Sequence, residues 1–331
     1  MISLLGAAAY LPEDVVPNAF FGDPEAPPSR MFRGAVQRRH ARPHETATGM
    51  IAAAARRLAE RLSLDLARDV DAVLTNVTVP DNPCTGCGAE VAHALGMAPR
   101  QVLDLHNGGC VSFVVMLDVA RALIAAGLAR SALLCAVGNA AGRIYAHPKN
   151  RRRPEAIVPG DGAGVGYVVE GDASPVRAIV RRDNVGYAAD MRIVRDDGSD
   201  WWAPSPDPGR LEFTPEKILA VMTRGNRLVP EVLHAACREA GIAPRDVGCL
   251  VTNQPNPLFL RNWREAMELH EASHVHTFPE HGNLFGAAIP VAIGRAEQIG
   301  RLRPGMFLAM GGFAHAGDLA AAAVVHWRAG A

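Results

Sequence analysis

Two nine-residue stretches decide the fold of this chain: "RDVDAVLTN" at 68–76 and "RDVGCLVTN" at 245–253. Both begin with Arg-Asp-Val and end with Thr-Asn, and the offset between them is constant (245 − 68 = 253 − 76 = 177). Each follows a segment with apolar residues at helical spacing, 48–64 and 228–242, and each leads into a loop that contains proline. The sequence therefore predicts a duplicated helix–strand–loop unit and two similar halves.

We expect an N-terminal half over 1–170, which carries Cys110, and a C-terminal half over 171–331, which carries Asn253 and Asn283. Short apolar segments alternate with helical ones in both halves, a pattern typical of mostly parallel sheets covered by helices. Loops at the junction of such halves are where α/β folds place ligands. The strands expected beyond the repeats are 101–107, 131–139, 160–172 (which begins as a glycine-rich turn), 305–317 and 318–327.

Composition excludes several function classes. The chain has 331 residues, 49% of them hydrophobic, and its 34 Lys and Arg balance 34 Asp and Glu. We therefore expect neither a nucleic-acid nor a membrane partner. The N-terminus, 1–16, lacks a basic segment and meets proline and acidic residues early, so it predicts a first strand rather than a signal peptide. These features predict a soluble, cytoplasmic protein.

Six cysteines are scattered along the chain, which is not typical of a secreted disulfide framework. Cys84 and Cys87 form a CxxC pair with no second pair or neighbouring histidines, so no metal site is expected. The favoured interpretation is two small residues in a loop that leads into a helix, and a redox pair is the alternative.

Cys110 stands in "DLHNGGCV" (104–111), directly before the apolar helical segment 112–127. As a structural residue it would be a small apolar group at a tight helix start. As a reactive residue it would gain from the helix N-terminus, whose free N–H groups and dipole lower the pKa of a thiol. Gly108 and Gly109 would leave room for a substrate carbonyl, and a thiolate here could accept an acyl group from a thioester.

These residues carry a resemblance to the thiolase superfamily, specifically to beta-ketoacyl-acyl carrier protein synthase III. The similar segments, in order, are 34–58, 104–113, 158–172, 281–293 and 309–317, so the resemblance covers nearly the whole chain. It implies an α/β fold of five αβαβα layers, built from two pseudo-symmetric halves and usually dimeric.

Carried over by position, the resemblance implies that Cys110 is the acyl-accepting nucleophile and that Asn283 is the family's active-site asparagine. Gly312 would supply a backbone N–H that joins the N–H of Cys110 in an oxyanion hole. One position departs: Asn253 stands where the family has its catalytic histidine. An amide can donate a hydrogen bond, but it cannot carry a proton.

The departure at Asn253 leaves three functions open. The preferred prediction is an acyltransferase that passes the acyl group from Cys110 to a heteroatom acceptor in a biosynthetic pathway. The alternatives are a carbon–carbon condensing enzyme and a catalytically silent binding paralogue. Heteroatom transfer would need a base, for which His281 is the first candidate and His315, beside Asp318, the second. His106 and His147 are lesser candidates.

We expect no tightly bound cofactor. "GDGAG" (160–164) lacks the spacing of a dinucleotide site. The resemblance implies coenzyme A or a phosphopantetheine-bearing acyl carrier protein as the acyl donor, a small-molecule acceptor, and a homodimer. The basic segment 149–153 is either a solvated loop or a contact for donor phosphates. The segment around Trp201 and Trp202 either caps the active site or joins a dimer.

Overall fold

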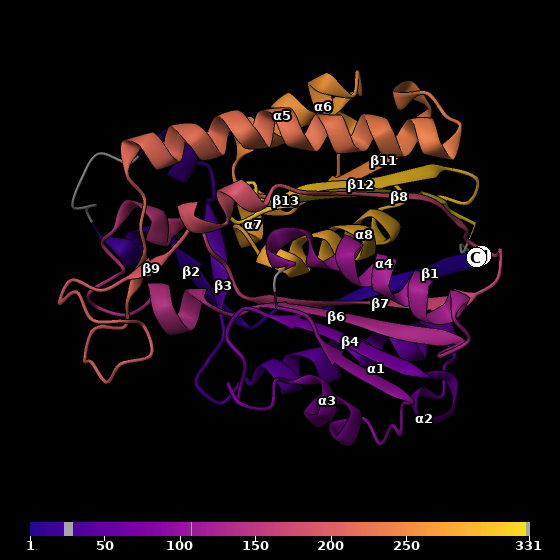
Figure 1. Cartoon of the computed structure of the whole chain (residues 1–331), viewed down its shortest axis with the longest axis horizontal. Coiled ribbons are helices and arrows are strands. Elements are labelled where there is room, and N and C mark those ends of the chain that lie inside the picture. The colour runs from indigo at the N-terminus through magenta and orange to yellow at the C-terminus, as the bar shows by residue number, and fades with distance from the viewer. Residues whose placement is uncertain (23–28, 107, 329–331) are drawn as a thin grey trace.

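The computed structural model describes residues 1–22, 29–106 and 108–328, which form five alternating layers of helices and sheets (Figure 1). The first sheet has the order β1-β7-β6-β4-β5 and the second the order β11-β12-β13-β8. The strands of the two sheets are β1 (Ile2–Tyr10), β4 (Ala72–Val77), β5 (Gln101–Asp104), β6 (Ser131–Gly138), β7 (Gly162–Glu170), β8 (Val176–Asp183), β11 (Val247–Thr252), β12 (Phe307–Ala314) and β13 (Leu319–His326).

Helices cover both sheets and fill the space between them. The central layer pairs α4 (Ser112–Ala125) with α8 (Ala288–Gln298), and both contribute to one large core that touches both sheets. The outer helices are α1 (Ala47–Leu62), α2 (Leu66–Asp69) and α3 (Gly88–Ala94) on the first sheet, and α5 (Pro215–Ala240) and α6 (Pro257–Ala266) on the second (Figure 1). The predicted five-layered αβαβα fold is confirmed.

Among the smaller elements, β2, β3 and β9 lie at one end of the layers, at the left of Figure 1. Two short hairpins join β2 (Asp14–Pro17) to β3 (Gln37–His40) and β9 (Ile193–Val194) to β10 (Arg210–Leu211). The short helical segments are η1 (Asn18–Phe21), η2 (Arg30–Phe32), η3 (Gly109–Val111), η4 (Ala141–Tyr145, a π-helix), η5 (Pro154–Ile157), η6 (Val185–Asp190), η7 (Pro244–Asp246), η8 (Glu271–Ser273), α7 (Phe278–His281) and η9 (Phe285–Ala287).

The two repeats end in equivalent strands. β4 runs parallel to β6, which is antiparallel to β7, and β7 is antiparallel to β1. β11, β12, β13 and β8 repeat this order and these directions. Where the first sheet has β5 beside β4, the second has only an isolated parallel bridge between Leu250 and His274. β7 ends at Glu170 and β8 begins at Val176, so each sheet draws its strands from one half of the chain.

Two expectations are wrong in detail. The sheets are mixed rather than mostly parallel, because the chain returns from β12 to β13 through the short turn 315–318 instead of a crossover helix. The helix expected over 228–242 begins earlier, at Pro215, and runs through Pro230. Its apolar face packs on the second sheet, which compensates for the backbone hydrogen bond that Pro230 cannot donate. None of the helices in the described part of the chain is long and apolar enough to cross a membrane.

Candidate functional site

Cys110 lies in η3, between the end of β5 and the start of the buried helix α4. Gly109 has a φ of +48°, and a Cβ there would lie 2.9 Å from Cβ of Ala314. Both the conformation and the close approach of β12 therefore require glycine at this position. A Cβ at Gly108 would lie 2.6 Å from Cβ of Ser112, so the turn before the cysteine is equally tight. Asn107 lies outside the described residues.

Cys110 opens into a cavity of about 360 Å³ at the junction of the two halves. Segments from both halves meet there, as the duplication predicts. Most of its wall is apolar, with a few polar groups near the cysteine. The lining residues used below are Asn76, His106, Cys110, Tyr145 and Glu155 from the first half, and Met191, Ile193, Leu211, Phe213, Asn253, Asn283, Phe285, Phe313 and His315 from the second.

Two side-chain amides converge on the sulfur of Cys110. Asn283 accepts a hydrogen bond from the N–H of Phe285 (3.0 Å) through Oδ1, which turns its NH₂ group toward the cysteine. Asn253 is held by the backbone of Phe313: its Oδ1 accepts from the N–H (3.4 Å) and its Nδ2 donates to the carbonyl (3.3 Å). Both Asn283 and Asn253 line the same cavity as Cys110, and hydrogen bonding from both amides acts to lower the pKa of its thiol.

Burial acts on the thiol of Cys110 against the lowering of the pKa that the helix start predicts. Burial raises its pKa to about 12, and the hydrogen bonds from Asn283 and Asn253 act in the opposite direction without offsetting it. The residue keeps partial exposure only where it faces the cavity. The thiol is therefore protonated near neutral pH in the free protein, and its reaction needs a group that takes the proton.

Gly312 lies in β12 and contacts Asn253. A Cβ at Gly312 would lie 2.4 Å from Oδ1 of Asn253 and 3.1 Å from its Cβ. The absence of a side chain at Gly312 thus lets the amide of Asn253 lie across the strand and reach Cys110.

The structure places two of the four candidate histidine bases along the cavity and two away from it. His281 lies at the end of α7 and is not among the cavity-lining residues. Its Nδ1 is buried and has no hydrogen-bond partner among the described residues, and burial lowers the pKa of its imidazole. His147 lies on the basic loop, where its Nδ1 accepts from the N–H of Lys149 (3.3 Å). His106 and His315 do line the cavity, and Nδ1 of His315 lies 3.1 Å from both carboxylate oxygens of Asp318.

Sequence reasoning missed several residues of the cavity wall. Met191, Ile193, Leu211 and Phe213 come from the β9–β10 hairpin and its flanks, within the segment that also holds the tryptophans. Their i, i+2 spacing, which places both members of each pair on one face of a strand, was the available signal. Trp201 and Trp202 themselves are 62% and 68% exposed, so this insertion covers the cavity with its aliphatic and phenylalanine residues instead.

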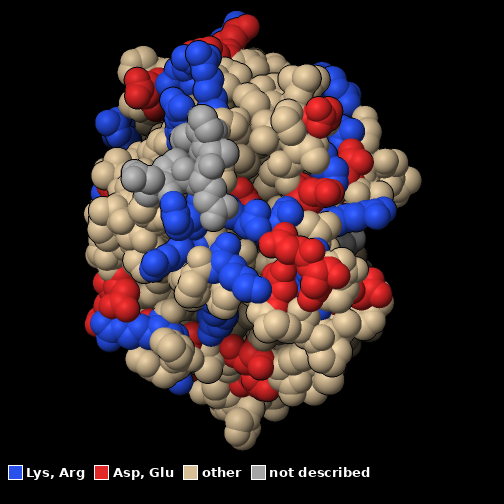
Figure 2. Space-filling view, turned by 90° about the vertical axis from the view of Figure 1, so that its left-hand side faces the viewer, with Lys and Arg blue, Asp and Glu red and all other residues tan. Residues whose placement is uncertain are grey.

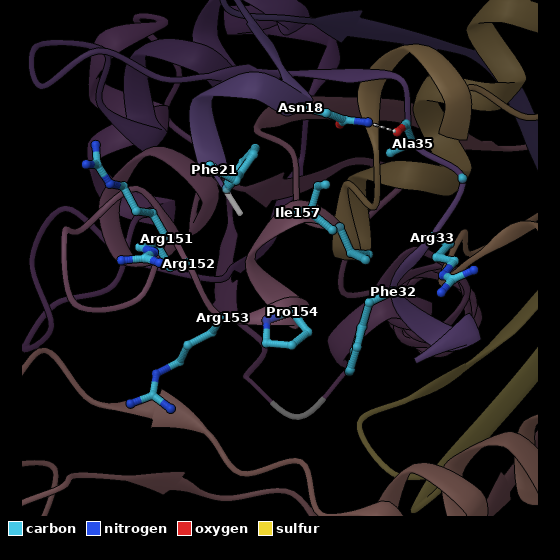
Figure 3. Close-up of a pocket in the computed structure, with 13 residues that line it drawn as sticks. Asn18, Phe21, Phe32, Arg33, Ala35, Arg151, Arg152, Arg153, Pro154 and Ile157 are labelled. Carbon is cyan, nitrogen blue, oxygen red and sulfur yellow. Dashed lines mark hydrogen bonds between the residues drawn. The ribbon is translucent and has the colours of Figure 1, made fainter. Parts of the chain in front are cut away.

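A smaller basic hollow of about 180 Å³ adjoins the cavity and shares Phe32 and Val158 with it. Figure 3 shows Arg151, Arg152 and Arg153 along one side and Arg33 on the other. Figure 2 shows Lys and Arg side chains gathered on this face of the molecule.

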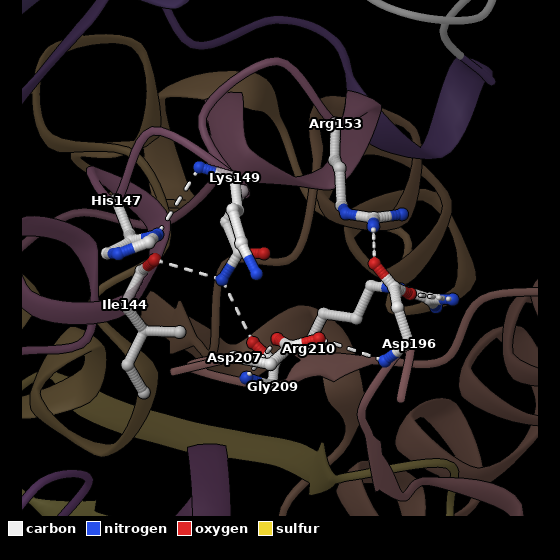
Figure 4. Close-up of polar contacts among 9 residues, drawn as sticks. Ile144, His147, Lys149, Arg153, Asp196, Asp207, Gly209 and Arg210 are labelled. Carbon is white, nitrogen blue, oxygen red and sulfur yellow. Dashed lines mark hydrogen bonds and ion pairs between the residues drawn. The ribbon is translucent and has the colours of Figure 1, made fainter. Parts of the chain in front are cut away.

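Ion pairs and hydrogen bonds fasten this basic loop to the insertion (Figure 4). Arg153 pairs with Asp196 (3.2 Å), which also pairs with Arg210 (3.3 Å). Asn150 donates to the carbonyl of Gly209 (2.9 Å). The basic loop and the segment that covers the cavity are therefore held against each other.

Cys84 is exposed and Cys87 is buried, and both are free thiols. Within the described ranges, no group of three or more His, Cys, Asp or Glu residues is placed to hold a metal ion.

Comparison with known proteins identifies the relatives of this chain. Residues 103–181 match the family described as 3-Oxoacyl-[acyl-carrier-protein (ACP)] synthase III, and residues 237–327 match its C-terminal region. The chain is 32% identical to a beta-ketoacyl-[acyl-carrier-protein] synthase III of Paracoccus denitrificans over 92% of both chains. A protein of the same name from Deinococcus radiodurans is 28% identical over 98% of this chain and 95% of its own.

Solved structures agree with the sequence relatives. The synthase III of Thermus thermophilus superposes with a TM-score of 0.83 at 27% identity, covering 99% of this chain and 100% of its own. The priming beta-ketosynthase of the R1128 polyketide pathway has a TM-score of 0.83 at 22% identity, with 100% and 97% coverage, which shows a shared fold.

Proposed function

The chain belongs to the 3-oxoacyl-[acyl-carrier-protein] synthase III family, and on that premise we propose that it is a ketosynthase that works through an acyl-enzyme on Cys110. It takes an acyl group from a thioester and joins it to a carbon nucleophile made from a second thioester. The observation that carries this proposal is the cysteine at an apolar cavity with two side-chain amides bonded to its sulfur.

Loading is an exchange of thioesters. The sulfur of Cys110 attacks the carbonyl carbon of the donor, a C–S bond forms, and the donor C–S bond breaks. The proton of the cysteine ends on the departing thiol, so atoms and charge balance. The backbone N–H groups of Cys110 and Gly312 are the proposed donors to the oxyanion, and removal of one such donor typically costs about 10²–10³ in rate.

Condensation needs an enolate, which forms when a malonyl-type thioester loses carbon dioxide. The NH₂ groups of Asn283 and Asn253 already point at the sulfur, so they can also donate to an enolate oxygen next to it. The enolate carbon attacks the acyl carbonyl, and the sulfur of Cys110 leaves and recovers one proton.

The donor is a thioester of coenzyme A or of a carrier protein's phosphopantetheine. The arginines of the hollow in Figure 3 provide positive charge beside the cavity mouth, which suits phosphate groups. A second basic hollow of about 540 Å³, lined by Arg30, Arg33, Arg261 and Arg264, offers charge to an acidic carrier protein. We further propose a cytoplasmic homodimer, as the family resemblance implies.

Carbon–carbon condensation replaces heteroatom transfer as the first proposal, because the relatives carry the name of ketoacyl synthases. Heteroatom transfer stays as a second candidate on one specific observation. Asn253 occupies the place of the family's histidine and cannot exchange a proton, whereas transfer to an alcohol or amine needs no enolate. The silent paralogue has no such support, since Cys110, Asn283 and Gly312 are all retained.

One experiment tests the proposal and separates the two candidates. The protein is incubated with a panel of acyl-coenzyme A and acyl-carrier thioesters, and its intact mass is measured. One added acyl mass that disappears in Cys110→Ala supports the acyl-enzyme, and acylation that persists in the variant refutes it. Malonyl thioester or a panel of alcohols and amines is then added. Carbon dioxide release with a ketoacyl product supports condensation, and an ester or amide product without carbon dioxide supports the second candidate.

A further inference from the structure

His315 combines features that no other histidine of the described residues shares. It lines the cavity of Cys110, and its Nδ1 faces both oxygens of Asp318 at 3.1 Å. The opposite ring nitrogen, Nε2, points at Gly109, since a Cβ on that glycine would lie 3.0 Å from it. His315 therefore presents one nitrogen to a carboxylate and the other to the residue that precedes the nucleophile.

The backbone supports this orientation. His315 has a φ of +48°, a left-handed conformation that is unfavourable for a non-glycine residue. The carboxylate of Asp318, three residues along the same turn between β12 and β13, fixes the ring. The His315 side chain is 36% exposed, so it can exchange protons with solvent as well as with the cavity.

The reaction needs such a group because the amides around the sulfur cannot take its proton. The thiol of Cys110 is protonated at neutral pH, since burial raises its pKa to about 12. Asn253 and Asn283 donate hydrogen bonds but have no proton to exchange. Among the cavity-lining residues, His106 lies on the segment after β5, and its side chain has no carboxylate partner in the described chain.

The charged and titratable surroundings of His315 are few. Asp318 lies on its own turn, and Arg224 of α5 donates to the carbonyl of Ala316 and pairs with Asp190. His106 and Glu155 line the same cavity. Among the described residues, the carboxylate of Asp318 is the hydrogen-bond partner recorded for the His315 ring.

We propose that His315, oriented by Asp318, is the proton acceptor and donor of Cys110. In loading, Nε2 takes the thiol proton, directly or through one water, as the sulfur bonds to the donor carbonyl, and then gives this proton to the departing thiol. When the acyl group leaves Cys110 for its acceptor, the protonated ring returns one proton, drawn from solvent, to the sulfur. This inference rests on the proposed acyl-enzyme and adds to it the residue that moves the proton.

The test measures proton transfer apart from turnover. Wild type, His315→Gln, Asp318→Asn and the surface control His93→Gln are compared, each carrying Cys84→Ser because Cys84 is exposed. The rate of Cys110 alkylation by iodoacetamide is followed by peptide mass from pH 5 to 9. Single-turnover acyl loading is measured over the same range, with a melting curve to verify folding.

In wild type and His93→Gln, both rates should rise with pH, because only a neutral imidazole can accept the thiol proton. In His315→Gln the alkylation curve should move up by about one pH unit or more, and loading should fall roughly 10²-fold, the usual contribution of a general base. Asp318→Asn, which keeps the imidazole, should fall between the two.

A folded His315→Gln protein whose two curves coincide with those of wild type overturns the proposal. If that variant does not fold, Asp318→Asn decides, and unchanged curves again overturn it. A wild type that accepts no acyl group from any donor refutes the proposed function alone, because the alkylation curves still report whether His315 serves Cys110.

Discussion

Replacing Gly312 by alanine should displace the amide of Asn253 and thereby both destabilise the protein and slow its chemistry. The new Cβ would lie 2.4 Å from Oδ1 of Asn253, about 1 Å inside an ordinary contact distance. The atom on the other side of the clash is the end of a side chain, so Asn253 rotates while the strand stays in place.

The cost follows from the contacts that Asn253 loses. Its two hydrogen bonds to the backbone of Phe313, at 3.3 and 3.4 Å, cannot survive a shift of this size. At about 1 kcal/mol for each hydrogen bond, Gly312→Ala should lower the free energy of unfolding by roughly 2 kcal/mol. Loading should slow as well, because one of the two amides that hydrogen-bond the sulfur moves away.

A double-mutant cycle with Asn253→Ala isolates this effect. In the double variant the clashing oxygen is gone and the nearest remaining atom, Cβ at 253, lies 3.1 Å away. Gly312→Ala should therefore cost about 1–2 kcal/mol less on the Asn253→Ala background, measured by denaturant unfolding. Gly311→Ala is the matched control: its Cβ would meet Leu233 at 3.0 Å, and its cost should be the same on both backgrounds. Additive costs for Gly312→Ala would refute the reasoning.

Three further predictions concern the cavity and its surroundings. Asn253→His should raise carbon dioxide release from malonyl thioester by roughly 10-fold or more, because an imidazole can take up charge that an amide cannot; an unchanged rate would contradict this. Phe213→Ala should shift acyl preference toward longer chains by about 10-fold in relative loading rate, since the ring lines the cavity and packs edge-on against Phe32; an unchanged chain-length profile in competition assays would contradict it. Stability should fall between pH 6.5 and 4, because burial lowers the pKa of His40 to about 4. In this range His40 binds a proton in the unfolded chain but stays neutral in the folded chain. The stability present above pH 6.5 is therefore lost as the pH falls. His40→Phe should flatten this slope in denaturant unfolding, and a slope equal to that of wild type would exclude His40 as its source.

The repeats and the family resemblance were sufficient to predict the layers, because hydrophobic periodicity and turn residues act locally. The RDV…TN repeats run from α2 into β4 and from η7 through β11, and the glycine-flanked Cys110 lies in η3, directly before α4. The direction of the strands within each sheet was harder to predict from the sequence. The tight turn 315–318, which makes β12 and β13 antiparallel, resembles a loop before a new parallel strand when only its composition is read.

A site residue could be predicted from the sequence when its role depends on its own place at the end of a helix or strand. A residue whose role depends on contacts with segments distant in the sequence could not be predicted. Cys110, Asn253 and Asn283 converge because each stands at the end of a predicted element. The sequence ranked His281 before His315 as the base, whereas the fold places His315 and not His281 along the cavity wall. The pKa of Cys110 was equally hidden: the helix start is local, whereas the burial that outweighs it comes from both halves.

The duplication also explains why Asn253 can reach the cysteine although its counterpart cannot. Asn76 pairs with Ala136 in the neighbouring strand, and Thr252 pairs with Gly311, so Asn253 falls beside Gly312. In the first half, the residue paired with the asparagine is Ala136, which carries a methyl group where Gly312 has none. Asn76 donates to the carbonyl of Leu105 (2.7 Å), beyond β5.

Gly312 has no such methyl group, and Asn253 lies across β12 toward Phe313 and Cys110. The two asparagines thus differ in the residue beside them, which is Ala136 for Asn76 and Gly312 for Asn253. Asn76 hydrogen-bonds the segment that precedes the nucleophile, whereas the amide of Asn253 is directed to the nucleophile itself. Gly312→Ala gives the second half the residue of the first. Its outcome therefore tests whether the direction of the amide, rather than the identity of the residue at 253, decides what that amide does at the sulfur.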